Sequence, residues 1–349
     1  MNKKTTTAIF FVSLVVLYHF VFEYNPTKES IDTNRYAERS INDKPNNSNI
    51  EHIKTIQNSQ TTKQDEKMKQ QLDFNQFKTN INELLIQIKN GEQHNISKKD
   101  TNKIVFKMQN HGYDYKKTYE AITKLYRSNI TNKSKIFLVD LLGKIGTYDS
   151  TQTLMKILDI NDDNLPIVAK NKTAIRNLVY KNNTKQINYD VSSVLVEYWK
   201  KSENKKYKQA VATTILQIGN KKESKHIIDK LDEQIDDDEV VYISTALKEI
   251  NDEETTAYLY KKYNSEYSSD SMKNATIEAL PFVANKTALS SLYNWSSKTS
   301  DIDKAIKYFE IAKKNNPKAG SIIKEELYAN KIKFESDDVK LAIEKVFKK

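Results

Sequence analysis

The sequence predicts an all-α fold in which most of the chain forms an α-solenoid, a stack of helix–turn–helix units. Two stretches indicate it: LLGKIGTYDSTQTLMKIL (141–158) and TILQIGNKKESKHIIDKL (214–231) share an Ile-Gly pair, a polar gap and then an apolar pair. A phrase that returns in this way is typical of stacked helical units. The chain also has only six Gly and five Pro among its 349 residues, which are too few turn formers for an all-β fold.

The N-terminus carries an apolar run from Ala8 to Phe22 that follows Lys3 and Lys4. The run is short for a membrane span but long enough if its ends reach the interface. We predict that residues 1–23 form an uncleaved signal anchor, a single transmembrane helix whose N-terminus stays in the cytoplasm. A cleaved signal peptide and a buried helix are the alternatives, and no small-x-small cleavage site follows the run.

Residues 24–71 are polar and rich in Asn, Lys, Thr and Ser, and no apolar period persists in them. We expect a disordered linker here, followed by a repeat domain over residues 72–349. With the predicted anchor in front, that domain would be periplasmic or extracellular, tethered to a bacterial inner (cytoplasmic) membrane by a single pass.

The repeat domain begins with one amphipathic helix. Its apolar residues recur at steps of three and four, as expected for one buried helix face. Gly91 follows and is predicted to end the helix. The apolar residues are Phe74, Phe77, Ile81, Leu84, Leu85 and Ile88.

Seven units then follow one another with a period near 32 residues. Aligned on the first apolar residue of each second helix, the markers are Ile122, Leu154, Leu195, Ile227, Leu259, Leu292 and Ile323. Four residues later stand Tyr126, Leu158, Trp199, Leu231, Tyr263, Ser296 and Leu327, six of which are large. A two-helix unit cannot bury its apolar faces alone, so stacked units must bury one another.

The first helix of a unit shows the same register. Twelve residues before the marker stand Leu142, Ile215, Leu247, Leu280 and Ile311. Eight residues before it stand Gly146, Gly219, Asn251, Ala284 and Asn315. Gly and Asn at that place suit a left-handed residue that ends a helix. One step is 41 residues instead of about 32, and the polar stretch KNNTKQIN, Lys181 to Asn188, supplies the insertion as a loop.

The phrase LLGKIG…STQTLMKIL resembles the HEAT-like repeats of bacterial proteins, which are armadillo-like helical pairs. Ile-Gly recurs at Ile218-Gly219 and weakens to Ile250-Asn251 and Val283-Ala284, and the resemblance covers about 104–349. The turn lacks that family's usual Asp and Arg. One segment resembles a tetratricopeptide repeat instead, through Ala305, Phe309, Ala312 and Pro317, although Tyr293 stands where that repeat has a small residue.

Composition excludes some chemistry. The chain has no Cys, so disulfides, thiolate metal sites and a Cys nucleophile are excluded. Asp159 to Asp163 imitates the start of a calcium loop, but Asn164 and Lys170 occupy the places that need Gly and Glu. We predict no catalytic residue, no metal site and no cofactor. None of the histidines has a second ligand at metal spacing; they are His19, His52, His94, His111 and His226.

One basic cluster is a candidate anion contact. The net charge of +10 attracts phosphate, anionic lipid or acidic glycan. The cluster is expected in the loop after the helix that carries Trp199, and an ordinary solvated loop is the alternative. Trp199 itself is assigned to the core, and the acidic run 236–239 to a solvated turn. The lysines are Lys200, Lys201, Lys205, Lys206 and Lys208.

These observations favour a non-enzymatic scaffold or adaptor that is tethered to a membrane and binds a protein or peptide on its solenoid surface. The alternative is a binder of an anionic ligand, such as an envelope glycan, a lipid headgroup or, less expected, nucleic acid. HEAT-like repeats also occur in chromophore lyases and DNA-repair glycosylases, so the resemblance leaves an enzyme as a third class.

Overall fold

The computed structural model describes residues 72–110, 115–160, 164–181, 185–329 and 332–348. Two of the sequence-based predictions, the anchor at 1–23 and the linker at 24–71, lie outside the described residues. The described residues all belong to one compact unit of the chain.

Regular structure in the described residues is helical, apart from one isolated antiparallel bridge between Tyr180 and Ile187. The predicted all-α class is therefore confirmed. Residues 72–89 form the first described helix. The short 3-10 helices are η1 (Gln93–Asn95), η2 (Tyr189–Val191) and η3 (Lys230–Asp232).

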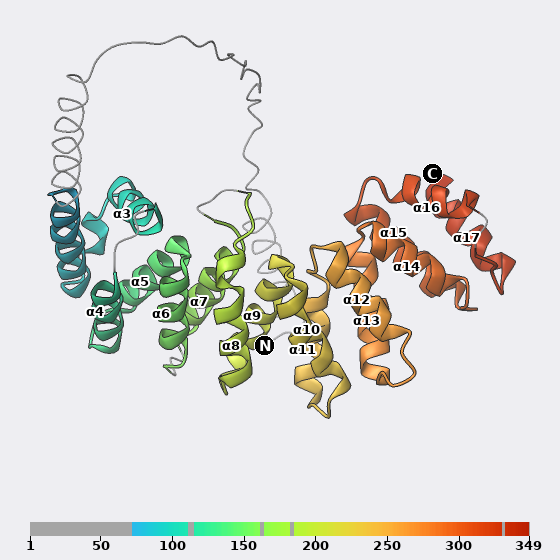
Figure 1. Cartoon of the computed structure of the whole chain (residues 1–349), viewed down its shortest axis with the longest axis horizontal. Helices are drawn as coiled ribbons and strands as arrows, with labels where there is room; N and C mark the ends of the chain where they lie inside the picture. The colour runs from blue at the N-terminus through green and yellow to red at the C-terminus, as the bar shows by residue number, and fades with distance from the viewer. Residues whose placement is uncertain (1–71, 111–114, 161–163, 182–184, 330–331, 349) are drawn as a thin grey trace, which may run out of the picture. The chain divides into compact units, whose positions relative to one another are not determined.

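The α-helices pack as two layers in a repeat-like arrangement, in chain order (Figure 1). One layer holds the odd-numbered helices, in which α3 packs on α5, α5 on α7, and so on to α17. They are α3 (Lys98–Asn110), α5 (Asn132–Ile145), α7 (Leu165–Asn177), α9 (Lys205–Ile218), α11 (Asp237–Leu247), α13 (Asp270–Val283), α15 (Ile302–Asn315) and α17 (Asp337–Lys348).

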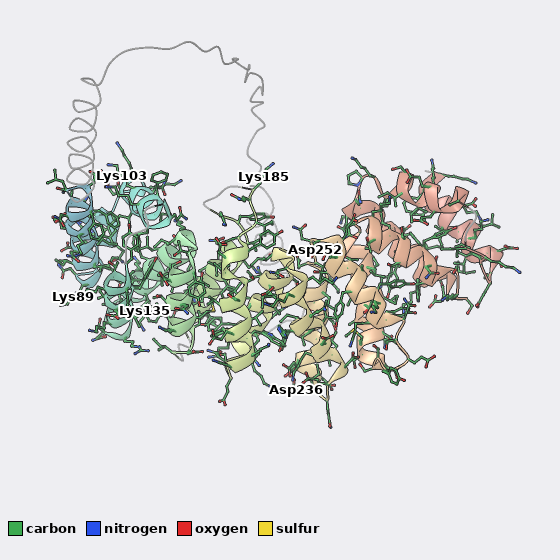
Figure 2. The ribbon with its side chains drawn as sticks, viewed as in Figure 1. Lys89, Lys103, Lys135, Lys185, Asp236 and Asp252 are labelled. Carbon is green, nitrogen blue, oxygen red and sulfur yellow. The ribbon has the colours of Figure 1, made fainter. Side chains whose placement is uncertain are left out.

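The second layer holds the even-numbered helices, each of which packs on the next even-numbered helix from α4 to α16. They are α4 (Lys116–Arg127), α6 (Tyr148–Leu158), α8 (Ser192–Lys201), α10 (Lys221–Asp229), α12 (Glu253–Tyr263), α14 (Lys286–Ser296) and α16 (Ala319–Tyr328). Consecutive helices are antiparallel: Asp236 and Asp252, the N-caps of α11 and α12, lie at opposite edges in Figure 2.

The repeat register predicted from the sequence is confirmed. All seven markers, from Ile122 to Ile323, lie on even-numbered helices and are fully buried. Trp199 is 4% exposed and belongs to the core, as predicted. In the first helix, Phe77 and Ile81 are buried, and Gly91 ends the helix with φ +78. Each apolar face is thus covered by a neighbouring repeat.

The prediction for the helix ends is only partly correct. Gly146, Gly219 and also Ala284 end their helices with a positive φ. Asn251 does not end a helix with a positive φ, because α11 already ends at Leu247. After that residue, the backbone N–H groups donate to the carbonyl three residues earlier in the chain. Asn315 is still helical, and the next residue is extended because it precedes a proline, whose ring excludes the helical region there.

The predicted insertion is a short hairpin-like loop, of which residues 182–184 lie outside the described residues. The backbone N–H of Lys181 donates to the carbonyl of Gln186 at 2.8 Å. Asn188 is buried, and its side-chain amide donates to the carbonyl of Gly146 at 2.8 Å. The longer repeat therefore still binds the turn of the preceding one.

This bridge between turns occurs twice, at the residues seven places before the markers Leu195 and Ile323. The amide of Asn316 donates to the carbonyl of Ala284 at 2.7 Å, as Asn188 does to Gly146. Asp252 lies seven places before the marker Leu259 and next to the turn at Gly219. One of its carboxylate oxygens, Oδ2, is buried without a hydrogen-bond partner. A carboxylate cannot donate to a carbonyl, so this turn lacks the bridge.

We therefore expect Asp252→Asn to stabilise the protein by about 1 kcal/mol, the net value of one hydrogen bond. The Asn oxygen retains the N-cap bond that Asp252 now accepts from Thr255 at 2.7 Å. The measurement is thermal unfolding followed by circular dichroism. A lower melting temperature for the variant would contradict the bridge.

Candidate binding surface

The predicted lysines lie on two helices, not in a loop. Lys200 and Lys201 end α8, and Lys205, Lys206 and Lys208 stand in the first turn of α9. The connection between them has only three residues, 202–204, so the predicted loop is wrong. The turn is tight because the caps of the two helices are only two residues apart. The backbone N–H of Ser202, the C-cap of α8, donates to the carbonyl of Tyr198, and the side chain of Asn204, the N-cap of α9, accepts the backbone N–H of Lys206.

Two side chains of this turn fasten it to the preceding repeat. The hydroxyl of Ser202 donates to Asp159 at 3.1 Å. The amide of Asn204 donates to the carbonyl of Leu158, the last residue of α6, at 2.9 Å. The start of α9 is therefore held against the C-terminal end of α6.

The lysines do not form one basic patch. Lys201 pairs with Glu197 at 2.7 Å, and Lys205 pairs with Asp236 at 2.6 Å. The hydrogen bond from Lys205 lowers the pKa of Asp236, and that from Lys201 lowers the pKa of Glu197. These two lysines are thus already neutralised by carboxylates.

The Lys205–Asp236 pair also corrects the predicted role of the acidic run. Asp236 is the N-cap of α11, where its side chain accepts the backbone N–H of Glu239 at 2.8 Å. The rest of the run lies in the first turn of the helix. Carboxylates are stabilising there because the helix N-terminus carries a partial positive charge.

The same electrostatics explain why basic residues gather beside Trp199. The last turn of a helix carries a partial negative charge, which favours basic side chains. Four consecutive even-numbered helices carry basic residues in their last turn. These residues are Lys156 in α6, Lys200 and Lys201 in α8, His226 in α10, and Lys261 and Lys262 in α12. We call this strip, from α6 to α12, the C-terminal edge.

The C-terminal edge has a groove of about 450 Å³ between α6 and α8, here called the α6–α8 groove. Met155, Val194 and Tyr198, each at most 6% exposed, form its apolar floor. The pKa of Tyr198 is raised, and burial of its hydroxyl is the largest cause. The tyrosine is thus neutral at physiological pH and offers a ring and a hydroxyl rather than a charge.

Charged residues line the rim of the α6–α8 groove. Lys201 and Glu197 neutralise each other as a pair. The remaining lining charges are Lys156, Asp159 and Glu203, which sum to one negative charge. This groove favours a cation over an anion.

A second groove, of about 310 Å³, lies on the other side of α8 and is called the α8–α10 groove. Lys200 and Lys208 line it together with Trp199, and the Lys208 ammonium lies 5.7 Å from the centroid of the Trp199 ring. Lys200 Nζ lies 3.1 Å from His226 Nε2. Because an ammonium only donates, His226 accepts through Nε2 and is neutral. Two effects lower the pKa of His226: its burial, which is the larger, and the positive charge of Lys200.

The carboxylates that line the α8–α10 groove all have donors. Asp229 accepts from the Tyr258 hydroxyl at 2.6 Å. Glu239 accepts from the Tyr242 hydroxyl at 2.7 Å, and Glu233 pairs with Lys230. Lys200 and Lys208 have no carboxylate partner among the described residues. Because a hydroxyl donor does not cancel the charge of a carboxylate, the three lysines and three carboxylates that line this groove balance in number.

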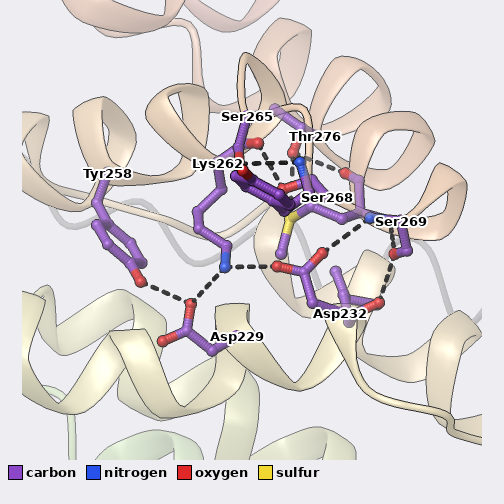
Figure 3. Close-up of polar contacts among 11 residues, drawn as sticks. Asp229, Asp232, Tyr258, Lys262, Ser265, Ser268, Ser269 and Thr276 are labelled. Carbon is purple, nitrogen blue, oxygen red and sulfur yellow. Dashed lines mark hydrogen bonds and ion pairs between the residues drawn. The ribbon is translucent and has the colours of Figure 1, made fainter.

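A polar network fixes the far end of the α8–α10 groove (Figure 3). Lys262 of α12 lies 3.3 Å from Asp229 and 2.5 Å from Asp232. Asp232 also accepts the backbone N–H of Ser269, the N-cap of α13, at 3.0 Å. Burial opposes the charge on Lys262, but the hydrogen bond to Asp232 and the charge of both aspartates raise its pKa. The network joins the end of α10 and η3 to α12 and to the start of α13, and it holds the acidic side chains in place.

A larger hollow of about 650 Å³ lies between helix 72–89 and α3. Its apolar wall includes Phe77, Leu84 and Ile104. The lysines and carboxylates that line it balance in number. None of the predicted site residues lines it, and it has no excess charge that would select a ligand.

No protein-family model matches the chain, and no curated protein matches its sequence. In the described part of the chain, no helix is both long and apolar enough to cross a membrane. No group of three or more His, Asp or Glu side chains within the described ranges could hold a metal ion.

Sequence analysis located the lysines but did not find the two grooves. It placed Lys200 and Lys201 in one cluster, although adjacent residues on a helix point about 100° apart. Lys201 therefore lines the α6–α8 groove, and Lys200 lines the α8–α10 groove. If Lys200 and Lys201 had been assigned to the end of the helix rather than to a loop, the helical periodicity would have placed them on different sides of it.

Proposed function

We propose that the chain is a non-enzymatic helical-repeat adaptor, an α-solenoid of HEAT-like units, that binds a protein or peptide along the C-terminal edge. In this proposal residues 1–23 tether it to a bacterial cytoplasmic membrane as a signal anchor. The observation that carries the proposal is the pair of grooves on either side of α8, each of which is lined by charges of both signs.

Grooves that are lined by charges of both signs favour a polypeptide over a polyanion. A nucleic acid, a polyanionic glycan or an anionic lipid surface needs several unpaired basic groups in one patch. Here Lys201 and Lys205 are paired with carboxylates, and the α6–α8 groove is net negative. A polypeptide can present basic and acidic side chains together, so it satisfies both grooves at once.

Site-specific photo-crosslinking in cells tests this proposal. A photoreactive residue at Gln152, which lines the α6–α8 groove, is compared with one at Thr173, an exposed residue of α7 in the other layer. We expect polypeptide adducts from position 152 that are absent at position 173. Adducts at neither position, or equal adducts at both, would refute a partner on the C-terminal edge.

Salt provides the second readout. A ligand held by many phosphate contacts loses roughly 10³–10⁵ in affinity when salt rises from 50 to 200 mM. We expect the yield of the adduct at position 152 to change far less across that range. A collapse of the yield would favour the polyanion instead.

A further inference from the structure

Positive charge is concentrated at the start of the repeat domain. Lys and Arg outnumber Asp and Glu by twelve to six in residues 72–135, but only by 34 to 32 in residues 136–349. The repeats that carry the C-terminal edge are therefore nearly neutral as a group. The first helices hold the excess, which attracts anions.

Five of these basic residues lie around one edge, where helix 72–89 and α4 end and α5 begins. The hydroxyl of Ser134, in the first turn of α5, donates to the carbonyl of Ile88 at 2.8 Å, so the start of α5 is held against the end of helix 72–89. Residues 128–131 join α4 to α5 at the same edge, where Figure 2 labels two of the lysines. We call the group the α4–α5 patch: Lys89, Lys124, Arg127, Lys133 and Lys135.

Carboxylates do not neutralise the α4–α5 patch. Its members other than Lys135 form no ion pair within the described ranges. The ammonium of Lys135 lies 5.3 Å from the centroid of the Tyr126 ring. Two carboxylates, Glu92 and Glu120, stand within four residues of the patch along the chain, so the patch keeps an excess of three positive charges.

Helix stability does not explain two of these lysines. Lys133 and Lys135 lie in the first turn of α5, which holds no acidic residue. The N-terminus of a helix carries a partial positive charge, which disfavours lysine there. In contrast, α11, α13, α15 and α17 all carry acidic residues in their first turn. Residues that oppose the local electrostatics without compensation point to a function.

The α4–α5 patch is an open surface rather than a pocket. None of its five side chains lines the three hollows described above. The ring beneath Lys135, that of Tyr126, is 1% exposed, so it cannot stack on a nucleic-acid base. Exposed basic side chains without a pocket suit an extended anionic surface, on which one headgroup can replace another.

The position of the patch in the chain selects that surface. The patch belongs to the first helices after the predicted linker, residues 24–71, and the predicted anchor, residues 1–23. A random coil of the linker's length has a root-mean-square reach of about 40 Å. Such a tether holds the patch at a high effective concentration beside the bilayer. The lipid headgroups are therefore the anions nearest to it.

We propose that the α4–α5 patch docks the start of the repeat domain on an anionic lipid surface, through the phosphates of the lipid headgroups. This inference rests on the membrane tether of the proposed function. It adds the face of the first helices that lies against the bilayer, and it leaves the C-terminal edge from α6 to α12 to the polypeptide partner.

Energy transfer from one fluorophore to an acceptor lipid measures this docking on the full chain reconstituted in vesicles. The chain has no Cys, so Asn129→Cys gives a single labelling site in the exposed connection between α4 and α5. The acceptor is a lipid labelled on its headgroup. One set of vesicles is phosphatidylcholine alone, and the other also contains phosphatidylglycerol, which is anionic.

We expect more efficient transfer in the vesicles that contain phosphatidylglycerol. The transfer should return to the phosphatidylcholine value in about 1 M salt, where the Debye length is about 3 Å. Equal transfer in the two kinds of vesicle, or a difference that salt does not reduce, would overturn the proposal.

A combined variant tests the patch itself. Lys124→Gln, Arg127→Gln and Lys133→Gln together should lower the ratio of docked to undocked molecules about a hundredfold, at roughly fivefold for each basic residue near an anionic surface. All three side chains are exposed, so the helix content measured by circular dichroism should not change.

The matched control removes the same charge elsewhere. Lys222→Gln, Lys286→Gln and Lys307→Gln change three exposed lysines that form no ion pair with any described residue. Their combination should leave the docked ratio unchanged. Equal losses for the two combined variants would show that only the total charge matters, and the patch would be refuted.

Soluble anions distinguish a lipid surface from other ligands. At equal ionic strength, neither glycerol phosphate nor a short single-stranded DNA should lower the transfer in phosphatidylglycerol vesicles. If either one does, the patch binds a free phosphate or a nucleic acid instead of the surface, and the proposal is overturned.

Flotation of the full chain with vesicles separates this inference from the proposed tether. A chain that floats with phosphatidylcholine vesicles in about 1 M salt carries the tether, and a missing lipid effect then refutes only the patch. A chain that floats only with phosphatidylglycerol vesicles at low salt refutes the tether and supports the patch. A chain that floats under neither condition refutes both.

Discussion

Leu259→Ala is expected to destabilise the protein by about 2–5 kcal/mol, the cost of removing a buried leucine side chain and leaving a cavity. Leu259 is the marker of its repeat, and it is fully buried where α12 packs against α10, α13 and α14. Because both layers meet at this residue, the surrounding helices cannot close the cavity without moving the neighbouring repeats.

Chemical denaturation followed by circular dichroism measures the effect. Lys222→Ala is the control, because Lys222 is exposed on α10, and it should cost less than about 0.5 kcal/mol. Equal shifts of the denaturation midpoint for the two variants would show that the repeat register is wrong.

Gly143→Ala is expected to destabilise the protein by about 1–3 kcal/mol through overpacking. A Cβ atom on Gly143 would lie 2.8 Å from Cβ of Ala174, 2.9 Å from its Cα and 3.0 Å from its carbonyl oxygen. Two of these three atoms belong to the backbone of α7, so no side-chain rotation relieves the contact. Helices α5 and α7 would have to separate.

Gly320→Ala is the matched control within a helix. A Cβ atom on Gly320 would contact only the ring edge of Phe347, at 3.4 Å. Alanine is favoured over glycine in a helix by about 0.5–1 kcal/mol, so this variant should be neutral or more stable. If Gly143→Ala behaved in the same way under thermal unfolding, the close approach of α5 and α7 would be wrong.

The two glycines of the Leu-Gly-x-Ile-Gly phrase show how far sequence analysis reaches. Gly146 recurs as Gly219 in the next copy of the phrase, and both end a helix with a positive φ, as the repeat predicted. Gly143 does not recur, since Leu216 holds its place. Its role depends on Ala174 of the next odd-numbered helix, which no comparison of repeats within the sequence could show.

The candidate site shows the same division. The sequence located the basic residues around Trp199 and assigned Trp199 to the core, because burial follows from periodicity. It could not tell which lysines are free. Lys205 is paired with Asp236, a residue 31 places further along the chain, whereas Lys208 lies over the Trp199 ring. Such partners become neighbours only when one repeat packs on the next.

The sequence by itself therefore determined the helical class, the register of the repeats and the buried face of each helix. These depend on the spacing of apolar residues within about 32 positions, which the chain displays directly. The tertiary structure decided which charges are neutralised, where Gly143 allows close packing and where grooves open beside α8. The physical reason is that these properties belong to contacts between repeats, and contacts between repeats are set by the packing of whole helices rather than by the residues next to one another in the chain.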